Sequence, residues 1–367
     1  MDAFFGSIGY FNAIIVFCLL VFVHELGHYL VARWAGVRVD VFSIGFGREI
    51  WGFTDKAGTR WKLSLVPLGG YVKMFGEGDT ILEGESERPL TPDERSVSFA
   101  HKPLGKRTAV VAAGPAANFL FAIVVLAGLY MVHGKPIPGD FEAQGVGAVR
   151  EGSAAEAAGF EPGDRILAVD GQPIGSFDDL RAAVAGSGGE RLTFTVDRAG
   201  ERLTLNAAPQ AQEGVTGEAA RYILGVTAPM TRFEKQGPLA AAWGGVEETG
   251  RLTVLTLSAV GEIIFGQRSI DDMGGPVKIV QLSNDVAQIG VVSLISFMAV
   301  LSINLGLLNL FPIPMLDGGH LAFYAVEAVR GKPVGERTQE YAFRIGLALL
   351  LGLMILITIN DVMGLAI

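Results

Sequence analysis

Cysteine and charge are both scarce in this sequence, and each scarcity excludes a class of protein. The chain of 367 residues contains one cysteine, Cys18, which excludes an internal disulfide framework and a cage of thiolate metal ligands. Only 18% of the residues are charged, whereas 50% are hydrophobic. A composition this apolar is not that of an ordinary soluble enzyme, so it predicts a membrane protein.

Four apolar segments are long enough to cross a bilayer, which takes roughly 20 residues in a helix. They cover residues 8–32, 108–132, 289–311 and 341–359. Residues 1–32 contain no Lys or Arg and show no clear small-residue cleavage site. We therefore expect the first segment to be a membrane span and not a signal peptide that is removed.

Basic residues gather in two of the loops between these segments. Residues 33–107 contain 12 Lys and Arg, and the loop before the fourth segment contains Arg330, Lys332 and Arg337. By the positive-inside rule both loops are cytoplasmic and both termini lie outside. Residues 134–285, with 13 basic against 21 acidic residues, would then form an acidic external region. This distribution does not predict nucleic-acid binding.

A short motif inside the first apolar segment carries the strongest chemical signal. It reads His-Glu-Leu-Gly-His over residues 24–28. On a helix, His24 and His28 lie one turn apart and can share one zinc ion, while Glu25 beside them can act as a general base. A chance match is the alternative, but ionisable residues at membrane depth are costly and usually functional. The motif therefore predicts an intramembrane metalloprotease.

A third ligand is expected, because catalytic zinc sites usually have three protein ligands. Asp317 follows the third apolar segment and can supply a carboxylate oxygen. Pro312 and Pro314 cannot continue a regular helix, so we expect the chain to unwind there and line a cavity. Gly318 and Gly319 allow a tight turn beside the ligand. An ordinary loop at the end of a helix is the alternative interpretation.

A fifth apolar stretch, 237–265, is interrupted by Glu247, Glu248, Arg251 and Glu262. We expect an amphipathic helix at the outer membrane surface, because a further span would put Asp317 on the wrong side of the membrane from His24.

Together these motifs resemble the site-2 protease family of intramembrane zinc metalloproteases, and within it the bacterial regulator-of-sigma-E type. The resemblance rests on HELGH at 24–28 and on NxxPxPxLDGG at 309–319. Three further family motifs occur in the same order, namely GFG at 45–47, PLGGYVKM at 67–74 and GPAANF at 114–119. The resemblance covers essentially the whole chain.

The resemblance implies a set of site residues and a substrate class. His24, His28 and Asp317 would bind Zn2+, and Glu25 would be the general base. The family pattern further implies a catalytic role for Asn304 and substrate contacts for Asn309, Pro312, Pro314, Gly45, Phe46 and Gly47. It gives His320 no role. The implied substrates are single-span membrane proteins, such as anti-sigma factors already cut by another protease or leftover signal peptides.

A helical substrate must be unwound before its peptide bonds can be attacked. Alternating segments at 37–42, 61–66 and 72–75 can present a strand edge to an extended substrate. A plain cytoplasmic β-hairpin is the alternative.

Residues 145–208 resemble a PDZ module of the kind found in bacterial proteases. The pattern includes the PGDRILAVDG run at 162–171, a helix at 176–186 and strands at 191–197 and 201–206. Such a module could hold a peptide end in a groove, or it could be a bulky gate that excludes intact proteins by size. The segment shows no reliable carboxylate-loop signature, which favours the gate.

The predicted fold is thus a polytopic α-helical membrane protein of the bacterial inner membrane, with four transmembrane helices, a membrane-associated cytoplasmic β-region and one external α+β PDZ domain. The active site is expected toward the cytoplasmic side. Two other functions are possible, an inactive scaffold that presents the PDZ domain and an anchored protease that cuts soluble substrates outside. The predicted boundaries are 1–35 for the first span with HELGH, 36–107 for the β-region, 108–133 for the second span and 142–208 for the PDZ domain. They continue with 209–286 for an external linker with the amphipathic helix, 287–320 for the third span with NxxPxPxLDGG, 321–340 for a cytoplasmic loop and 341–360 for the fourth span.

Overall fold

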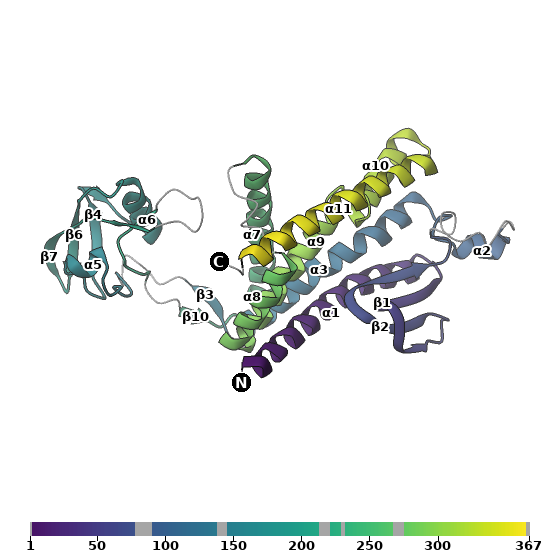
Figure 1. The fold of residues 1–367 in the computed structure, drawn as a ribbon, viewed down its shortest axis with the longest axis horizontal. Helices are drawn as coiled ribbons and strands as arrows, with labels where there is room; N and C mark the ends of the chain where they lie inside the picture. The colour runs from purple at the N-terminus through teal and green to yellow at the C-terminus, as the bar shows by residue number, and fades with distance from the viewer. Residues whose placement is uncertain are drawn as a thin grey trace. The chain divides into compact units, whose positions relative to one another are not determined.

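A computed structural model describes residues 2–77, 90–137, 145–212, 221–228, 232–266 and 275–364. The chain forms two compact units (Figure 1). The first, here called the membrane unit, comprises Met1–Val132 and Gln236–Ile367, and the second, here called the small unit, comprises His133–Lys235.

The described part of the membrane unit is built from helices and one pair of strands. The helices are α1 (Asp2–Trp34), α2 (Pro92–Val97), α3 (Leu104–Val132), α7 (Pro238–Ile264), α8 (Pro276–Ile289), α9 (Val291–Leu310), α10 (Asp317–Arg330) and α11 (Glu336–Gly364). Within the residues that the structure describes, four helical segments are long and apolar enough to cross a membrane, and they are Ile14–Trp34, Leu104–Val132, Val291–Leu310 and Arg337–Asp361. They coincide with the four apolar segments of the sequence, so four membrane-spanning helices are confirmed by length and composition.

Small residues let three of these helices approach closely, with α3 between α1 and α9 (Figure 1). A Cβ on Gly27 of α1 would lie 2.3 Å from the carbonyl oxygen of Ala113 in α3. A Cβ on Gly306 of α9 would lie 3.1 Å from the carbonyl oxygen of Pro115. Helices in lipid associate through such close packing, since the surrounding lipid is as apolar as their side chains.

The chain between α9 and α10 is not helical, as Pro312 and Pro314 predict. Met315 has a φ of 88°, and α10 begins two residues later. A Cβ on Gly318 would lie 2.2 Å from the carbonyl oxygens of Leu310 and Phe311. Glycine at this position therefore lets the start of α10 fold back onto the end of α9.

Strands β1 (Val39–Thr54) and β2 (Arg60–Met74) form a two-stranded antiparallel sheet beside α1. A Cβ on Gly70 of β2 would lie 2.8 Å from the Val21 side chain and 3.2 Å from that of Glu25. The predicted β-region is therefore in direct contact with the helix that carries the HELGH motif.

Helix α7 occupies the fifth apolar stretch. Its Gly245 packs against α3, where a Cβ would lie 2.7 Å from the carbonyl oxygen of Ile123. Farther along, the Thr256 hydroxyl donates a hydrogen bond to Asn304 of α9 (2.9 Å). The helix thus lies along two spans over several turns, and its placement at the outer membrane surface stays a prediction.

The small unit is an α+β structure around a four-stranded sheet in the order β5-β4-β6-β7. Its described elements are β3 (Lys135–Ile137), α5 (Ala154–Ala157), β4 (Arg165–Val169), β5 (Gln172–Pro173), α6 (Phe177–Gly186), β6 (Leu192–Arg198), β7 (Glu201–Ala207), β8 (Gln210–Gln212), β9 (Arg221–Ile223) and β10 (Arg232–Glu234). The core is apolar and includes Leu180, Phe194 and Val196.

This unit is larger than the segment 142–208 suggested by the sequence. The chain after β9 returns to the start of the unit, where the Arg150 amide donates to the carbonyl of Gly225 (2.8 Å) and the Ala155 amide donates to that of Leu224 (2.8 Å). Leu224 is itself part of the buried core. The fold of the small unit is therefore complete only when residues beyond 208 are included.

Candidate metal centre

Helix α1 and the first residue of α10 bring three potential metal ligands together. The Nε2 atoms of His24 and His28 lie 3.2 Å apart. The Oδ2 atom of Asp317 lies 3.1 Å from the first and 3.5 Å from the second. Both histidines are buried, with 8% and 7% of their surface exposed. Within the described residues these three form the group that could hold a metal ion.

The chemistry of this group fits zinc. The Nδ1 atom of His28 donates a hydrogen bond to the carbonyl of Val110 (2.9 Å), so Nε2 of the neutral ring carries a free lone pair. Asp317 Oδ2 is buried and has no hydrogen-bond partner among the described residues. Lone pairs that converge in a buried space repel one another unless a cation lies between them. Two imidazoles and one carboxylate are a ligand set typical of catalytic zinc sites.

A glycine of α3 makes room for the two histidines. A Cβ on Gly114 would lie 2.2 Å from Nε2 of His28 and 2.9 Å from Cε1 of His24. No side chain fits in this space, so α3 can pack this closely against the two histidines only with glycine at this position.

The position of Asp317 at the start of α10 favours its ionised form. The positive end of the helix dipole faces its carboxylate. Burial alone would raise the pKa of Asp317, but hydrogen bonds from His24 and His28, which form when these rings are protonated, hold that pKa well below its usual range.

The three ligands open into a cavity of about 250 Å³. It is lined by His24, Glu25, His28, Val72, Met74, Glu77, Val111, Asn309, Met315, Asp317 and His320. One wall is the end of β2, where Val72 and Met74 line the cavity together with Glu25. The HELGH glutamate therefore faces the same space as the ligands, as a general base must.

Of the other residues implied by the family pattern, some line the cavity and others do not. Asn309 lines the cavity, whereas Asn304 does not and instead accepts the hydrogen bond from Thr256. Pro312 and Pro314 lie in the non-helical segment before α10, outside the cavity lining. Gly45, Phe46 and Gly47 lie in β1, where Phe46 is 45% exposed and stacks on Tyr71. The roles proposed for these residues stay predictions.

Three residues near the ligands had no assigned role in the sequence analysis. Glu77 and His320 line the cavity, and Asn118 lies beside His24. Burial lowers the pKa of His320, so its ring is neutral at neutral pH. Asn118 lies in the GPAANF motif, so the sequence contained a feature that could have identified it as a site residue. Glu77 lies just beyond a strand and outside the motifs.

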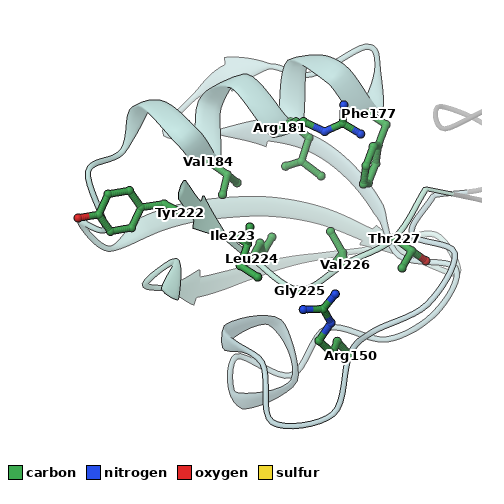
Figure 2. Close-up of a pocket in the computed structure, with 11 residues that line it drawn as sticks. Arg150, Phe177, Arg181, Val184, Tyr222, Ile223, Leu224, Gly225, Val226 and Thr227 are labelled. Carbon is green, nitrogen blue, oxygen red and sulfur yellow. The ribbon is translucent and has the colours of Figure 1, made fainter. Parts of the chain in front are cut away.

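The small unit has a groove of about 230 Å³ between α6 and residues 222–227. Figure 2 shows Phe177, Arg181 and Val184 of the helix on one side and the extended segment on the other. Arg150 lies below this segment in the same view. The groove thus has an apolar lining and two basic side chains, and its second wall lies beyond the predicted domain boundary at 208.

Comparison with known proteins gives results that agree with this geometry. The model of peptidase family M50 matches residues 12–353. A protein of Agrobacterium fabrum that carries the name of a zinc metalloprotease is 45% identical over 361 residues, covering 96% of this chain and 95% of its own length. The regulator of sigma-E protease RseP of Salmonella typhimurium is 32% identical over 444 residues, covering 95% of this chain and 97% of its own.

Proposed function

Because this chain belongs to peptidase family M50, the site-2 proteases, and is a zinc metalloprotease, we propose that it cleaves the transmembrane segments of single-span membrane proteins. The observation that carries this proposal is the position of the metal centre. His24, Glu25 and His28 lie within the span Ile14–Trp34, and Asp317 joins them from the segment that follows another span. A peptide bond that reaches this centre must therefore come from within or beside the bilayer.

The residues that line the cavity have separate roles in the proposed hydrolysis of a peptide bond. His24, His28 and Asp317 would hold the zinc ion, which supplies Lewis-acid activation of water and of the scissile carbonyl when it is bound. Glu25 takes the proton of the attacking water and delivers it to the leaving amine. Residues 70–74 of β2 lie against α1 beside Glu25 and can pair with an extended substrate backbone.

The proposed setting is the bacterial inner membrane. The two basic loops would be cytoplasmic, both termini would lie outside, and the metal centre would lie toward the cytoplasmic side. Since the Salmonella relative is named as a regulator of sigma-E protease, we infer that substrates of this chain include anti-sigma factors already shortened by a first protease. An inactive scaffold has no need of an intact set of three ligands and a base.

The decisive experiment compares the purified wild type with Glu25→Gln in detergent, using a model single-span substrate. We expect cleavage to fall by roughly 10²–10⁴-fold, because general acid–base catalysis contributes that much. Bound zinc, measured by elemental analysis, should stay unchanged, since Glu25 is not a ligand. Glu201→Gln, on the surface of the small unit, is the matched control and should cleave normally. A wild type that binds no zinc and cannot be activated by added zinc would instead favour the scaffold.

The groove of the small unit favours a second role. We propose that this unit is a PDZ module that captures the free C-terminus of a shortened substrate, since the groove joins an extended segment, apolar side chains and two arginines. Arg181→Glu should then slow cleavage of a shortened substrate several-fold, whereas Arg202→Glu on strand β7 should not. Equal rates for both variants would leave the size gate as the better explanation.

A further inference from the structure

Asn118 is a fully buried polar residue of α3 that lies beside the metal centre. None of its surface is exposed, and its side-chain amide lies 3.0 Å from Nδ1 of His24. The other side-chain atom, assigned as Oδ1, has no hydrogen-bond partner among the described residues. Helix α9 contacts only the backbone of Asn118 through its Ser302 hydroxyl, which donates to the Asn118 carbonyl (2.9 Å).

The chemistry of His24 decides which end of this amide must face it. A nitrogen that binds a metal carries no proton, and Nε2 of His24 is the atom that faces the other two ligands. The single proton of the neutral ring is therefore on Nδ1, which must donate a hydrogen bond. An NH2 group cannot accept this bond, whereas the amide oxygen of Asn118 can.

Rotating the side-chain amide by a half turn exchanges its oxygen and nitrogen. This rotation breaks no hydrogen bond of the oxygen, because Oδ1 makes none in its present position among the described residues. The two ends of an asparagine amide are nearly identical in shape and are assigned from their partners. His28 provides an independent comparison, since its Nδ1 faces the Val110 carbonyl, which can only accept. With the amide turned, both ligand histidines are held in the same way, each by an oxygen that accepts from Nδ1.

We propose that Asn118 is a positioning residue of the metal centre, whose side-chain oxygen accepts a hydrogen bond from Nδ1 of His24. This bond fixes the tautomer and the orientation of the ring, so that Nε2 stays free for zinc. The proposal rests on zinc binding alone and does not depend on which substrate is cleaved.

The test is the zinc affinity of the full chain in detergent, measured by competition with a chromogenic chelator. Asn118→Leu keeps the size of the side chain and removes the acceptor, so zinc affinity should fall roughly 10–100-fold, the usual effect of losing such a partner. Asn118→Asp keeps an acceptor of the same shape and should bind zinc within a few-fold of the wild type. Ser302→Ala, which removes a neighbouring hydrogen bond but leaves the His24 contact intact, should bind zinc normally.

Wild-type affinity in a folded Asn118→Leu variant would overturn the proposal and leave Asn118 a packing residue. If that variant does not fold, NMR of the zinc-loaded wild type with ¹⁵N-labelled histidine gives a direct answer. The expected spectrum has a protonated Nδ1 and a metal-shifted Nε2 for His24. A His24 ring with an unprotonated Nδ1 would contradict the proposal. These measurements do not involve cleavage, so they stand apart from the test of Glu25.

Discussion

Both units bury mainly apolar side chains, but they differ in the polar residues that they bury and in the apolar residues that they leave exposed. In the described part of the membrane unit, the polar residues His24, His28 and Asn118 are buried at the metal centre, while apolar residues such as Ile355 on α11 are more than half exposed. In the small unit the buried residues are mainly apolar, and the buried Asp164 is paired with Arg198. Because lipid is as apolar as the side chains that it covers, burial of apolar surface stabilises the small unit more than it stabilises the packing of membrane-spanning helices.

This difference indicates where each unit is vulnerable. Helices in lipid gain little by hiding apolar side chains from one another, so close contacts at small residues and buried polar contacts must hold them in register. A unit in water is held by its apolar core and suffers most when a buried charge loses its partner. Substitutions at a close-packed glycine, at a buried ion pair and at an interhelical hydrogen bond therefore test the comparison, in decreasing order of expected effect.

The largest effect is expected from Gly114→Ala. The new Cβ would lie 2.2 Å from Nε2 of His28, so the ring or the helix must move. Overpacking of this kind costs about 1–3 kcal/mol, and here it falls directly on a ligand. We expect zinc affinity, measured by chelator competition, to fall by about 100-fold, and cleavage to fall with it.

Gly128→Ala in the same helix is the matched control, because a Cβ there meets nothing within 4 Å. It should bind zinc and cleave as the wild type does. Equal behaviour of the two variants would mean that α3 tolerates added volume beside the ligands, and that close packing is not what places them.

A smaller effect, confined to the stability of the small unit, is expected from Arg198→Met. Arg198 donates two hydrogen bonds to the carboxylate of Asp164 (2.7 and 2.8 Å), whose side chain is fully buried. Breaking a buried pair costs roughly 3–5 kcal/mol, and because Arg198 itself is 28% exposed we expect about 2 kcal/mol. Hydrogen exchange of the small unit in the full chain measures this loss.

The exposed Arg202 on β7 provides the control, and Arg202→Met should leave hydrogen exchange unchanged. Zinc affinity should be the same in both variants. A loss of zinc in Arg198→Met would contradict the picture of two units stabilised by separate forces.

The sequence predicts the features that depend on local pattern. Hydrophobic runs predict the four spans, the spacing of His24 and His28 predicts two ligands, and the two prolines predict the unwound segment before Asp317. These features follow from helical period, residue chemistry and family resemblance, and they need no knowledge of which helices are neighbours.

The features that the sequence analysis missed depend on contacts between distant segments. Asn118 meets His24 across 94 residues, and Thr256 meets Asn304 across 48. The small unit is completed by residues 221–227, which follow its main sheet by a long connection. Periodicity shows which face of a helix is apolar, but it does not show which polar residue on another helix will face it.

The smallest effect is expected from Thr256→Val, which keeps the shape of the side chain and removes the hydroxyl that donates to Asn304. A lost hydrogen bond of this kind is worth about 1 kcal/mol, so cleavage of a single-span substrate should slow by about fivefold at unchanged zinc content. Thr253→Val, whose hydroxyl donates only to the Thr249 carbonyl of its own helix, is the control.

The double variant Thr256→Val with Asn304→Leu separates a direct effect on Asn304 from a general loosening of α7. If α7 acts on the reaction by holding the Asn304 amide, the effect of Thr256→Val should disappear once that amide is gone, because two residues that act through one hydrogen bond are not additive. Additive losses would mean that α7 supports the membrane unit through packing at positions such as Gly245, and that Asn304 acts without it.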